Sequence, residues 1–342
     1  MKNLFVLHTQ YNLILSAGLS INQATGLSDL ILFCDFELRK ELKDKIYRVY
    51  RKVLILKGNF PKAELTVREK MKKIFNDNKE IRNFIKESYD EIFIVDDMCI
   101  QEMYALKCVA KFNNNIKMSW LEDGSNAYFD IGVISGGMGA NFVKRGIRKF
   151  VFSFLYGLWG YYDLGTCMGT HKRLTNVYAL FPEVVRQEHK FQNKKKITQD
   201  QFIAGMKFIY EDKPIHFLEN SILIAIDKID VYGNELEKIN KFLAEIIVEA
   251  RQHQKTVYYK YHPRENQVLE GLSGGIELKR SVAFESYLIN SETEQLTIIG
   301  FKSTALQTAK KLGYETVSYI KQLETNNKNI TKFYESIGVI CK

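Results

Sequence analysis

Short apolar runs alternate with longer amphipathic stretches along the first half of the chain. The apolar runs cover residues 4–7, 30–33, 53–56, 92–95 and 116–120. Between them, apolar positions recur with helical spacing over residues 10–24, 37–50, 63–89 and 98–112. Strands that alternate with helices in this way predict right-handed crossovers and a parallel sheet. We therefore expect residues 1–170 to form one doubly wound, Rossmann-like domain.

The same alternation restarts in the second half. Strand-like runs cover residues 222–226, 256–261, 296–299 and 316–319, and the helical runs between them include 234–254 and 303–312. This pattern predicts a second Rossmann-like domain over residues 215–325. We expect residues 171–214 to connect the domains, and residues 326–342 to end in a helix that packs back on the first domain.

Two doubly wound domains predict an α/β protein of the GT-B type. In that architecture the carboxyl ends of both sheets face a central cleft, which is the expected place for a ligand. Fold alone does not fix a function.

Composition and charge narrow the class of protein. The hydrophobic fraction of 46% with 26% charged residues is typical of a soluble globular protein, and no stretch reaches the roughly 18 apolar residues of a membrane-spanning helix. Five scattered cysteines without a CxxC pair favour reduced thiols in the cytoplasm over a disulfide framework or a zinc site. The net charge of +9 favours an anionic partner: nucleic acid, a membrane surface or a charged substrate.

Two adjacent carboxylates, Glu122 and Asp123, directly follow the predicted strand 116–120. Gly124 permits a sharp turn behind them. Because close like charges raise the pKa of one carboxyl group, the pair can supply a general base. Taken alone, the motif is more often an acidic Asp-Gly turn.

A histidine follows the predicted strand 256–261. Pro263 keeps His262 in an extended conformation, and an imidazole there can donate to a phosphate or protonate a leaving group near neutral pH. Arg264 can direct two donors at a phosphate or carboxylate. The alternative is a histidine satisfied by a loop carbonyl beside a solvated arginine, but the cations around this proline-fixed histidine favour the functional interpretation.

The third motif is a strand-to-helix junction that begins at Gly300. Ser303 or Thr304 can cap the helix that follows, whose free first-turn amides form an anion site, and Lys302 adds a positive charge. An ordinary helix cap explains the hydroxyls equally well. The conjunction with His262 favours a phosphate site.

Together the three motifs specify inverting glycosyl transfer. A carboxylate of one domain faces a histidine and a phosphate site of the other: it deprotonates the acceptor hydroxyl on one face of the sugar, while the departing phosphate is neutralised on the opposite face. No DxD pair stands in the expected loop and no His/Cys cluster has metal-ligand spacing. We expect no metal, because Lys302, Arg264, His262 and helix amides can do the work of a divalent ion.

The order of these motifs resembles that of bacterial sialyltransferases and polysialyltransferases. Glu122-Asp123-Gly124, His262-Pro263 and Ser303-Thr304 match their acidic-acidic-Gly, His-Pro and Ser-[Ser/Thr] motifs. The opening Thr9-Gln10-Tyr11-Asn12 is similar to their first strand-to-helix turn, although a proline is more usual there. The nearest resemblance is to glycosyltransferase family fifty-two, which sialylates lipo-oligosaccharide or capsule repeats.

The resemblance implies a CMP-sialic acid donor, an oligosaccharide acceptor, inversion and no metal requirement. Asp123 or Glu122 would be the base, with Asp123 preferred. His262 would be the acid or a phosphate donor, and Ser303 and Thr304 would hold the CMP phosphate. In some branches the base follows the first strand of the second domain, where Asp227 and Asp230 stand; a solvated helix start is the more common explanation for these two.

A basic run at residues 144–149 precedes an aromatic, apolar run at 150–162. This pattern is typical of an interfacial membrane segment and equally of a buried helix with a charged shoulder. We expect the enzyme in the cytoplasm. If the acceptor is lipid-linked, we expect it on the inner face of the cytoplasmic membrane.

Three other functions fit parts of the pattern. The chain could be a GT-B transferase with a different nucleotide sugar, or a carbohydrate-binding protein without turnover. Nucleic-acid binding fits the charge, but the basic residues are spread along the chain and no helix-turn-helix, zinc-finger or RNP-like motif appears. We therefore expect no nucleic-acid partner.

Overall fold

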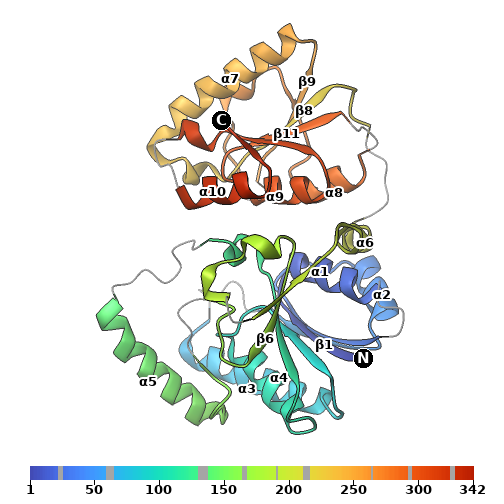
Figure 1. Cartoon of the computed structure of the whole chain (residues 1–342), viewed down its shortest axis with the longest axis vertical. Helices are drawn as coiled ribbons and strands as arrows, with labels where there is room; N and C mark the ends of the chain where they lie inside the picture. The colour runs from blue at the N-terminus through green and yellow to red at the C-terminus, as the bar shows by residue number, and fades with distance from the viewer. Residues whose placement is uncertain are drawn as a thin grey trace. The chain divides into compact units, whose positions relative to one another are not determined.

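The structure, a computed structural model, describes residues 1–21, 26–58, 65–129, 138–163, 168–189, 192–210, 216–262, 265–291, 295–323 and 328–342. It divides into two compact units, Met1–Ile209 and Tyr210–Lys342. Each unit is built on a parallel sheet with helices on both faces (Figure 1). The prediction of an α/β protein with two Rossmann-like domains is confirmed.

Unit 1 contains a seven-stranded sheet in the order β3-β2-β1-β4-β5-β6-β7, and all neighbouring strands are parallel. Its strands are β1 (Lys2–Leu7), β2 (Leu27–Cys34), β3 (Lys52–Lys57), β4 (Glu91–Ile94), β5 (Lys117–Leu121), β6 (Leu174–Ala179) and β7 (Asn193–Lys196). Its helices are α1 (Gln10–Ile21), α2 (Lys40–Val49), α3 (Val67–Phe84), α4 (Ile100–Ala110), α5 (Met138–Tyr156) and α6 (Gln199–Ile209). In Figure 1, α1, α2 and α6 lie on one side of this sheet and α3, α4 and α5 on the other.

The apolar pattern explains why β1 lies inside the sheet. Leu4, Phe5, Val6 and Leu7 are all fully buried, and a strand can bury successive side chains only if both faces of the sheet are covered. Helix α3 starts later than its apolar pattern, because Thr66 and Glu69 form a capping box that fixes its first turn.

Unit 1 extends past residue 170, the end that we expected. The segment predicted to connect the domains, 171–214, adds β6, β7 and α6 to this unit. Helix α6 packs closely on α1: a Cβ at Gly205 would lie 1.9 Å from the carbonyl oxygen of Ile14, and one at Gly18 would lie 2.0 Å from that of Gln201. Two glycines thus let the helix backbones touch.

Unit 2 contains a six-stranded parallel sheet in the order β10-β9-β8-β11-β12-β13. Its strands are β8 (Ser221–Ala225), β9 (Thr256–Lys260), β10 (Ile276–Glu277), β11 (Leu296–Gly300), β12 (Glu315–Ser318) and β13 (Ile340–Cys341). Helix α7 (Leu236–Gln252) covers one face, and α8 (Phe284–Ile289), α9 (Thr304–Lys311) and α10 (Lys328–Ser336) cover the other (Figure 1).

The last segment of the chain belongs to unit 2. We expected residues 326–342 to form a helix that packs back on the first domain. Instead α10 is followed by β13, which pairs with β12 as an edge strand of the second sheet.

The strand order places one reversal point in each sheet. In unit 1 the chain turns from one side to the other between β1 and β4, and in unit 2 between β8 and β11. Ligands of doubly wound sheets bind outside the carboxyl ends of the two strands at such a point. We therefore expect the functional side chains at the carboxyl ends of these strands.

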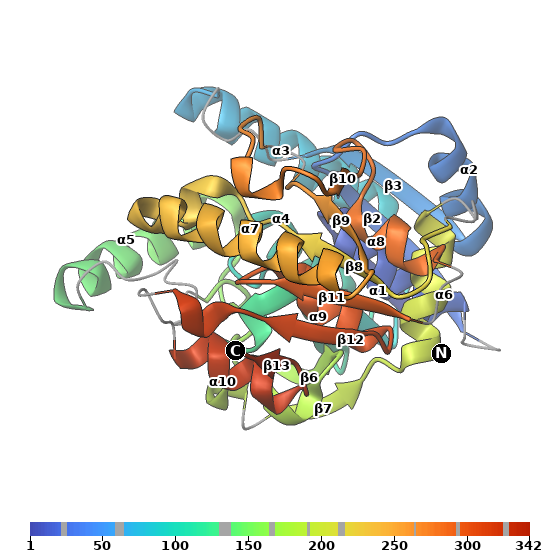
Figure 2. The same ribbon diagram turned by 90° about the horizontal axis from the view of Figure 1, so that it is seen from above.

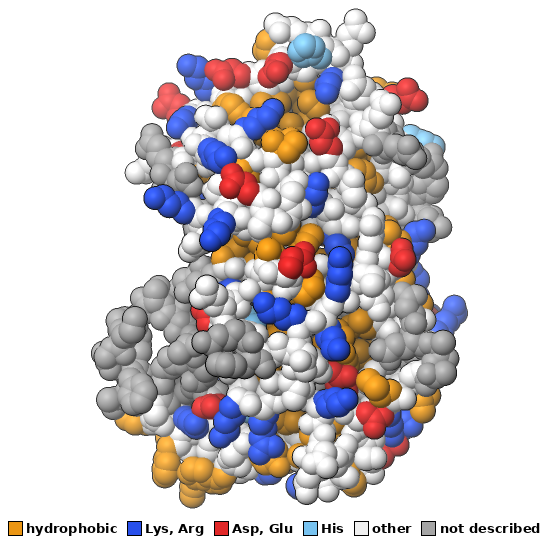
Figure 3. Space-filling view, viewed as in Figure 1, with side chains coloured by type: hydrophobic (Ala, Val, Ile, Leu, Met, Phe, Trp, Pro, Cys, Tyr) orange, Lys and Arg blue, Asp and Glu red, His pale blue; other side chains and the backbone are white. Residues whose placement is uncertain are grey.

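Helix α5 differs from the other helices of unit 1. It lies at the periphery of the unit, outside α4, in both views (Figures 1 and 2). Several of its large apolar side chains are exposed, and apolar side chains gather near its lower end in Figure 3.

Candidate active site

The two carboxylates of the acidic motif stand directly after β5 but in different environments. The amide of Glu122 still donates to the carbonyl of Tyr178 at 3.0 Å, which extends the pairing of β5 with β6. Glu122 is fully buried, whereas Asp123 is half-buried. Gly124 starts a 3-10 turn, Gly124–Ala127, with φ +59°, a conformation that a side chain would strain. Only Asp123 keeps access to a ligand.

Glu122 holds three segments of unit 1 together. The hydroxyls of Tyr11 and Tyr128 each donate to one of its oxygens, and the amide of Leu180 donates at 2.8 Å. Burial and the nearby carboxylate raise the pKa of both tyrosines well above the usual value, so both hydroxyls stay protonated. Glu122 is therefore a structural acceptor at the end of β5.

Asp123 is positioned by the first turn of α1. The side-chain amide of Asn12 donates to its Oδ1 at 3.1 Å, and the side-chain oxygen of Asn12 accepts from the amide of Thr9 at 3.0 Å. The Thr9 hydroxyl accepts in return from the Asn12 amide at 3.2 Å, so the two residues cap the helix reciprocally. Burial raises the pKa of Asp123, which suits a carboxylate that has to accept a proton. Gln10 begins α1 beside this cap and is half-buried.

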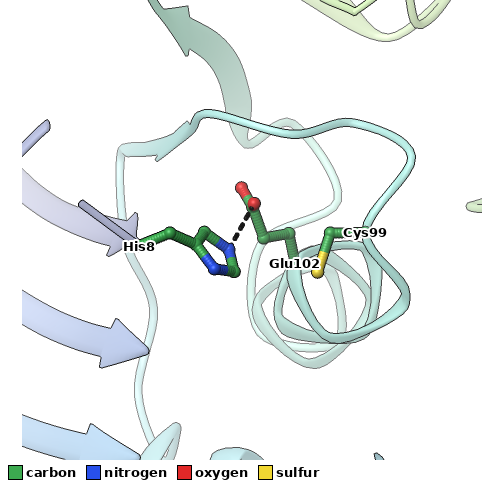
Figure 4. A group of neighbouring side chains, drawn as sticks. All are labelled: His8, Cys99 and Glu102. Atoms are coloured by element: carbon green, nitrogen blue, oxygen red, sulfur yellow. Dashed lines mark hydrogen bonds and ion pairs between the residues drawn. The ribbon is translucent and has the colours of Figure 1, made fainter. Parts of the chain in front are cut away.

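A half-buried histidine and a fully buried glutamate, a pair not predicted from the sequence, lie at the reversal point of the first sheet (Figure 4). His8 follows β1, and its Nε2 lies 2.8 Å from Oε1 of Glu102 on α4. Glu102 also accepts from the amides of Val95 at 2.8 Å and Asp96 at 3.1 Å, so it joins the ends of β1 and β4. Its burial raises the pKa of Glu102 to about 7.

This pair belongs to the one group of metal-binding side chains found among the described residues. His8, Cys99 and Glu102 place their ligand-type atoms within 4.8 Å of one another. A divalent ion that prefers mixed nitrogen, sulfur and oxygen ligands could bind there. The hydrogen bonds of Glu102 are equally consistent with a structural role, in which it joins the ends of β1 and β4. The sequence-based expectation of no metal stays a prediction.

In unit 2, Asp227 connects the loops that follow β8 and β11. Its side chain is buried and accepts from the Lys302 amide at 3.0 Å, and the hydroxyl of Tyr232 lies 3.4 Å away. Burial raises the pKa of Asp227 to about 6. Asp227 therefore links the carboxyl ends of β8 and β11, the two strands at the reversal point of this sheet.

Glu265 connects the histidine loop to the same β8 loop. Its carboxylate accepts from the amides of Ile229 and Gln267, both at 2.8 Å, and its own amide donates to the carbonyl of His262 at 2.9 Å. His262 is exposed one residue beyond Tyr261, which is fully buried after β9. Pro263 and Arg264 lie outside the described residues. The loops after β9, β8 and β11 are thus fixed to one another by two acidic side chains.

The junction after β11 forms the predicted helix cap. The Ser303 hydroxyl accepts from the Ala305 amide at 3.3 Å, and Thr304 is exposed at the first position of α9. Lys302 is half-buried beside them. Close packing explains the glycine at position 300, because a Cβ there would lie 3.2 Å from the carbonyl oxygen of Ala225 and 3.2 Å from the side chain of Leu306. This strand end offers helix amides and a cation, and β8 separates it from the strand that His262 follows.

Several solved structures have a similar fold at low sequence identity. A UDP-GlcNAc 2-epimerase from Methanocaldococcus jannaschii is 12% identical with a TM-score of 0.53, over 100% of this chain and 89% of that one. Another UDP-N-acetylglucosamine 2-epimerase is 14% identical with a TM-score of 0.55, over 98% and 87%. TcCGT1 in complex with UDP is 9% identical with a TM-score of 0.50, over 99% and 85%. At such identities the likeness shows the GT-B type of fold alone.

Sequence comparison identifies the family. No curated protein matches the chain at a significant level. The family model of the alpha-2,8-polysialyltransferases matches residues 30–320, a range that contains the acidic, histidine and serine motifs. The match covers well over half of the 342 residues. The chain therefore belongs to the alpha-2,8-polysialyltransferase family and is a glycosyltransferase of the sialyltransferase type.

Proposed function

We propose that the chain transfers sialic acid, with inversion and without a metal, from CMP-sialic acid to a hydroxyl of an oligosaccharide acceptor. The acceptor belongs to a bacterial surface glycan, a capsule or lipo-oligosaccharide. The motif order further supports kinship with glycosyltransferase family fifty-two. The observation that carries the proposal is the different environment of the two members of the acidic motif. Glu122 is fully buried and accepts from two tyrosine hydroxyls and a backbone amide, whereas Asp123 is half-buried and is held by the side-chain amide of Asn12.

In the proposed reaction Asp123 takes the proton of the acceptor hydroxyl. The acceptor oxygen forms a bond to the anomeric carbon of sialic acid, and the bond from that carbon to the phosphate oxygen breaks. CMP leaves with the bonding electrons. His262 donates a hydrogen bond or a proton to the departing phosphate.

Unit 2 supplies the donor side of the proposal. His262 follows β9, and Lys302 and the first amides of α9 follow β11. Strand β8 lies between them, and Asp227 and Glu265 connect its loop to the loops of both. Helix amides and cations stabilise a phosphate without an added ion. That Asp123 and His262 meet across one cleft stays a prediction.

Binding of the nucleotide alone tests the choice of donor. We expect CMP to raise the melting temperature, and UDP and GDP to leave it unchanged. At a CMP concentration 100-fold above its dissociation constant, the folded state gains about 2.7 kcal/mol. Asp123→Asn should keep this shift because it lies on the acceptor side, whereas His262→Ala should reduce it. A shift with UDP or GDP and none with CMP would contradict the proposed donor.

A further inference from the structure

Helix α5 exposes a continuous apolar stripe. Ile147, Phe150, Val151, Phe154 and Leu155 follow one another at intervals of three and one residues, which places them on one face of a helix. All five are exposed, and Phe150 and Phe154 most of all, at 61% and 68%. Soluble proteins seldom leave a stripe of large apolar side chains uncovered without a binding role. We call these five residues the α5 face.

The opposite side of the helix is anchored in unit 1. Ser153 and Tyr156 are buried, and Phe152 packs against the rings of Tyr156 and Tyr162. The exposed Trp159 extends the stripe beyond the helix end and packs edge-to-face on Phe150, with ring centroids 5.4 Å apart. The α5 face therefore points away from the core that holds the helix.

The charged residues of helix α5 are all basic. Helix α5 contains four basic residues, Lys144, Arg145, Arg148 and Lys149, and no acidic one. The exposed Lys149 forms an ion pair with Asp163 at 2.7 Å. The whole chain carries a net charge of +9.

We propose that the α5 face docks on an anionic lipid surface, with its aromatic side chains in the headgroup region. An apolar stripe on a helix whose charged residues are all basic is typical of a helix that lies in the membrane interface. Among the described residues, no helix is long and apolar enough to cross a bilayer. Phosphates of anionic lipids complement the basic residues.

A second copy of the chain fits the α5 face less well than a lipid surface does. Paired α5 faces would bring two basic helices together without a neutralising acid on either helix. A stable protein interface also uses about 20–30 residues on each side, several times the number in this stripe. A lipid surface needs no matching shape.

Docking would also bring the proposed acceptor edge to the lipid surface, and this part rests on the proposed function. Beyond α5, the Tyr162 hydroxyl donates to the Met98 carbonyl at 3.2 Å. The amides of Gly169 and His171 donate to Asp97 at 3.0 and 2.7 Å. These bonds connect the segment after α5 to the β4–α4 loop at the reversal point of the first sheet. The acceptor that fits this placement is a lipid-linked glycan.

Vesicle binding of the full chain tests the docking surface directly. We expect cosedimentation with phosphatidylcholine vesicles that contain phosphatidylglycerol, much weaker binding to phosphatidylcholine alone, and weakening by salt. Phe154→Ser should lower the affinity about tenfold or more, as expected for the loss of one buried aromatic side chain. The matched control is Phe112→Ser, which removes a 50% exposed phenylalanine at the end of α4 and should bind like the unaltered chain.

Tryptophan fluorescence supplies the second readout. The chain has two tryptophans; Trp120 is fully buried and Trp159 is 54% exposed. Anionic vesicles should therefore shift the emission to the blue through Trp159, and Trp159→Phe should abolish the shift. Unchanged binding by Phe154→Ser would overturn the proposal, and so would dimerisation that Phe154→Ser abolishes. The vesicle result does not depend on CMP binding, so failure of the donor proposal and failure of docking are distinguishable.

Discussion

An Asp123→Asn enzyme is expected to fold normally and to lose almost all transfer. Asparagine fills the same space but accepts no proton, so we expect kcat to fall about 10²- to 10⁴-fold, the usual contribution of a general base. The measurement is the rate of sialic acid transfer at saturating CMP-sialic acid. Because burial raises the pKa of Asp123, the acidic limb of the wild-type pH–rate profile should lie above the ordinary range of aspartate.

Glu122→Gln is the matched control for that result. Glu122 accepts hydrogen bonds from two tyrosines and a backbone amide, and a glutamine amide nitrogen cannot accept from them. The variant should lose about 1–3 kcal/mol of stability and keep a wild-type pH profile for the protein that remains folded. A folded, inactive Glu122→Gln beside an active Asp123→Asn would assign the base to Glu122.

His262→Ala should cause the second large loss. We expect kcat to fall about 10²- to 10⁴-fold, because the departing CMP phosphate loses its proton or hydrogen-bond donor. His253→Ala is the matched control: it removes an exposed histidine of the same unit, at the end of α7, and should leave kcat unchanged. Equal kcat values for the two variants would contradict the role of His262.

A glutamine at position 262 separates the two roles of the imidazole. Glutamine can donate a hydrogen bond to phosphate but cannot deliver a proton near neutral pH. His262→Gln should recover much of the activity if hydrogen bonding suffices. If protonation of the leaving group is required, it should be as slow as His262→Ala, and the alkaline limb of the pH–rate profile should disappear.

The sheets were predictable from the sequence because their inner strands are apolar on both faces. The boundary between the units was not. All four residues of β7 are exposed and three are lysines, which suits an edge strand but gives no apolar signal. Its preceding neighbour β6 contains an asparagine and a threonine. The predicted domain end near 170 therefore differs from the end of unit 1 at Ile209.

The acidic motif was visible in the sequence, but the different roles of its members were not. The roles depend on partners over a hundred residues away, Tyr11 for Glu122 and Asn12 for Asp123. The His8–Glu102 pair was missed for the same reason, since its members are 94 positions apart. One signal was available, because His8 immediately follows a strand end, as the three predicted motifs do.

Product analysis on the unaltered enzyme tests the central claim most directly. The chain is incubated with CMP-sialic acid and a sialylated oligosaccharide, with EDTA present, and both CMP and the extended glycan are separated and quantified. We predict equal amounts of the two products with CMP-sialic acid, and none with UDP-GlcNAc as the donor. Glycan extension from UDP-GlcNAc, or CMP-sialic acid left intact beside a bound acceptor, would contradict the assignment as a sialyltransferase.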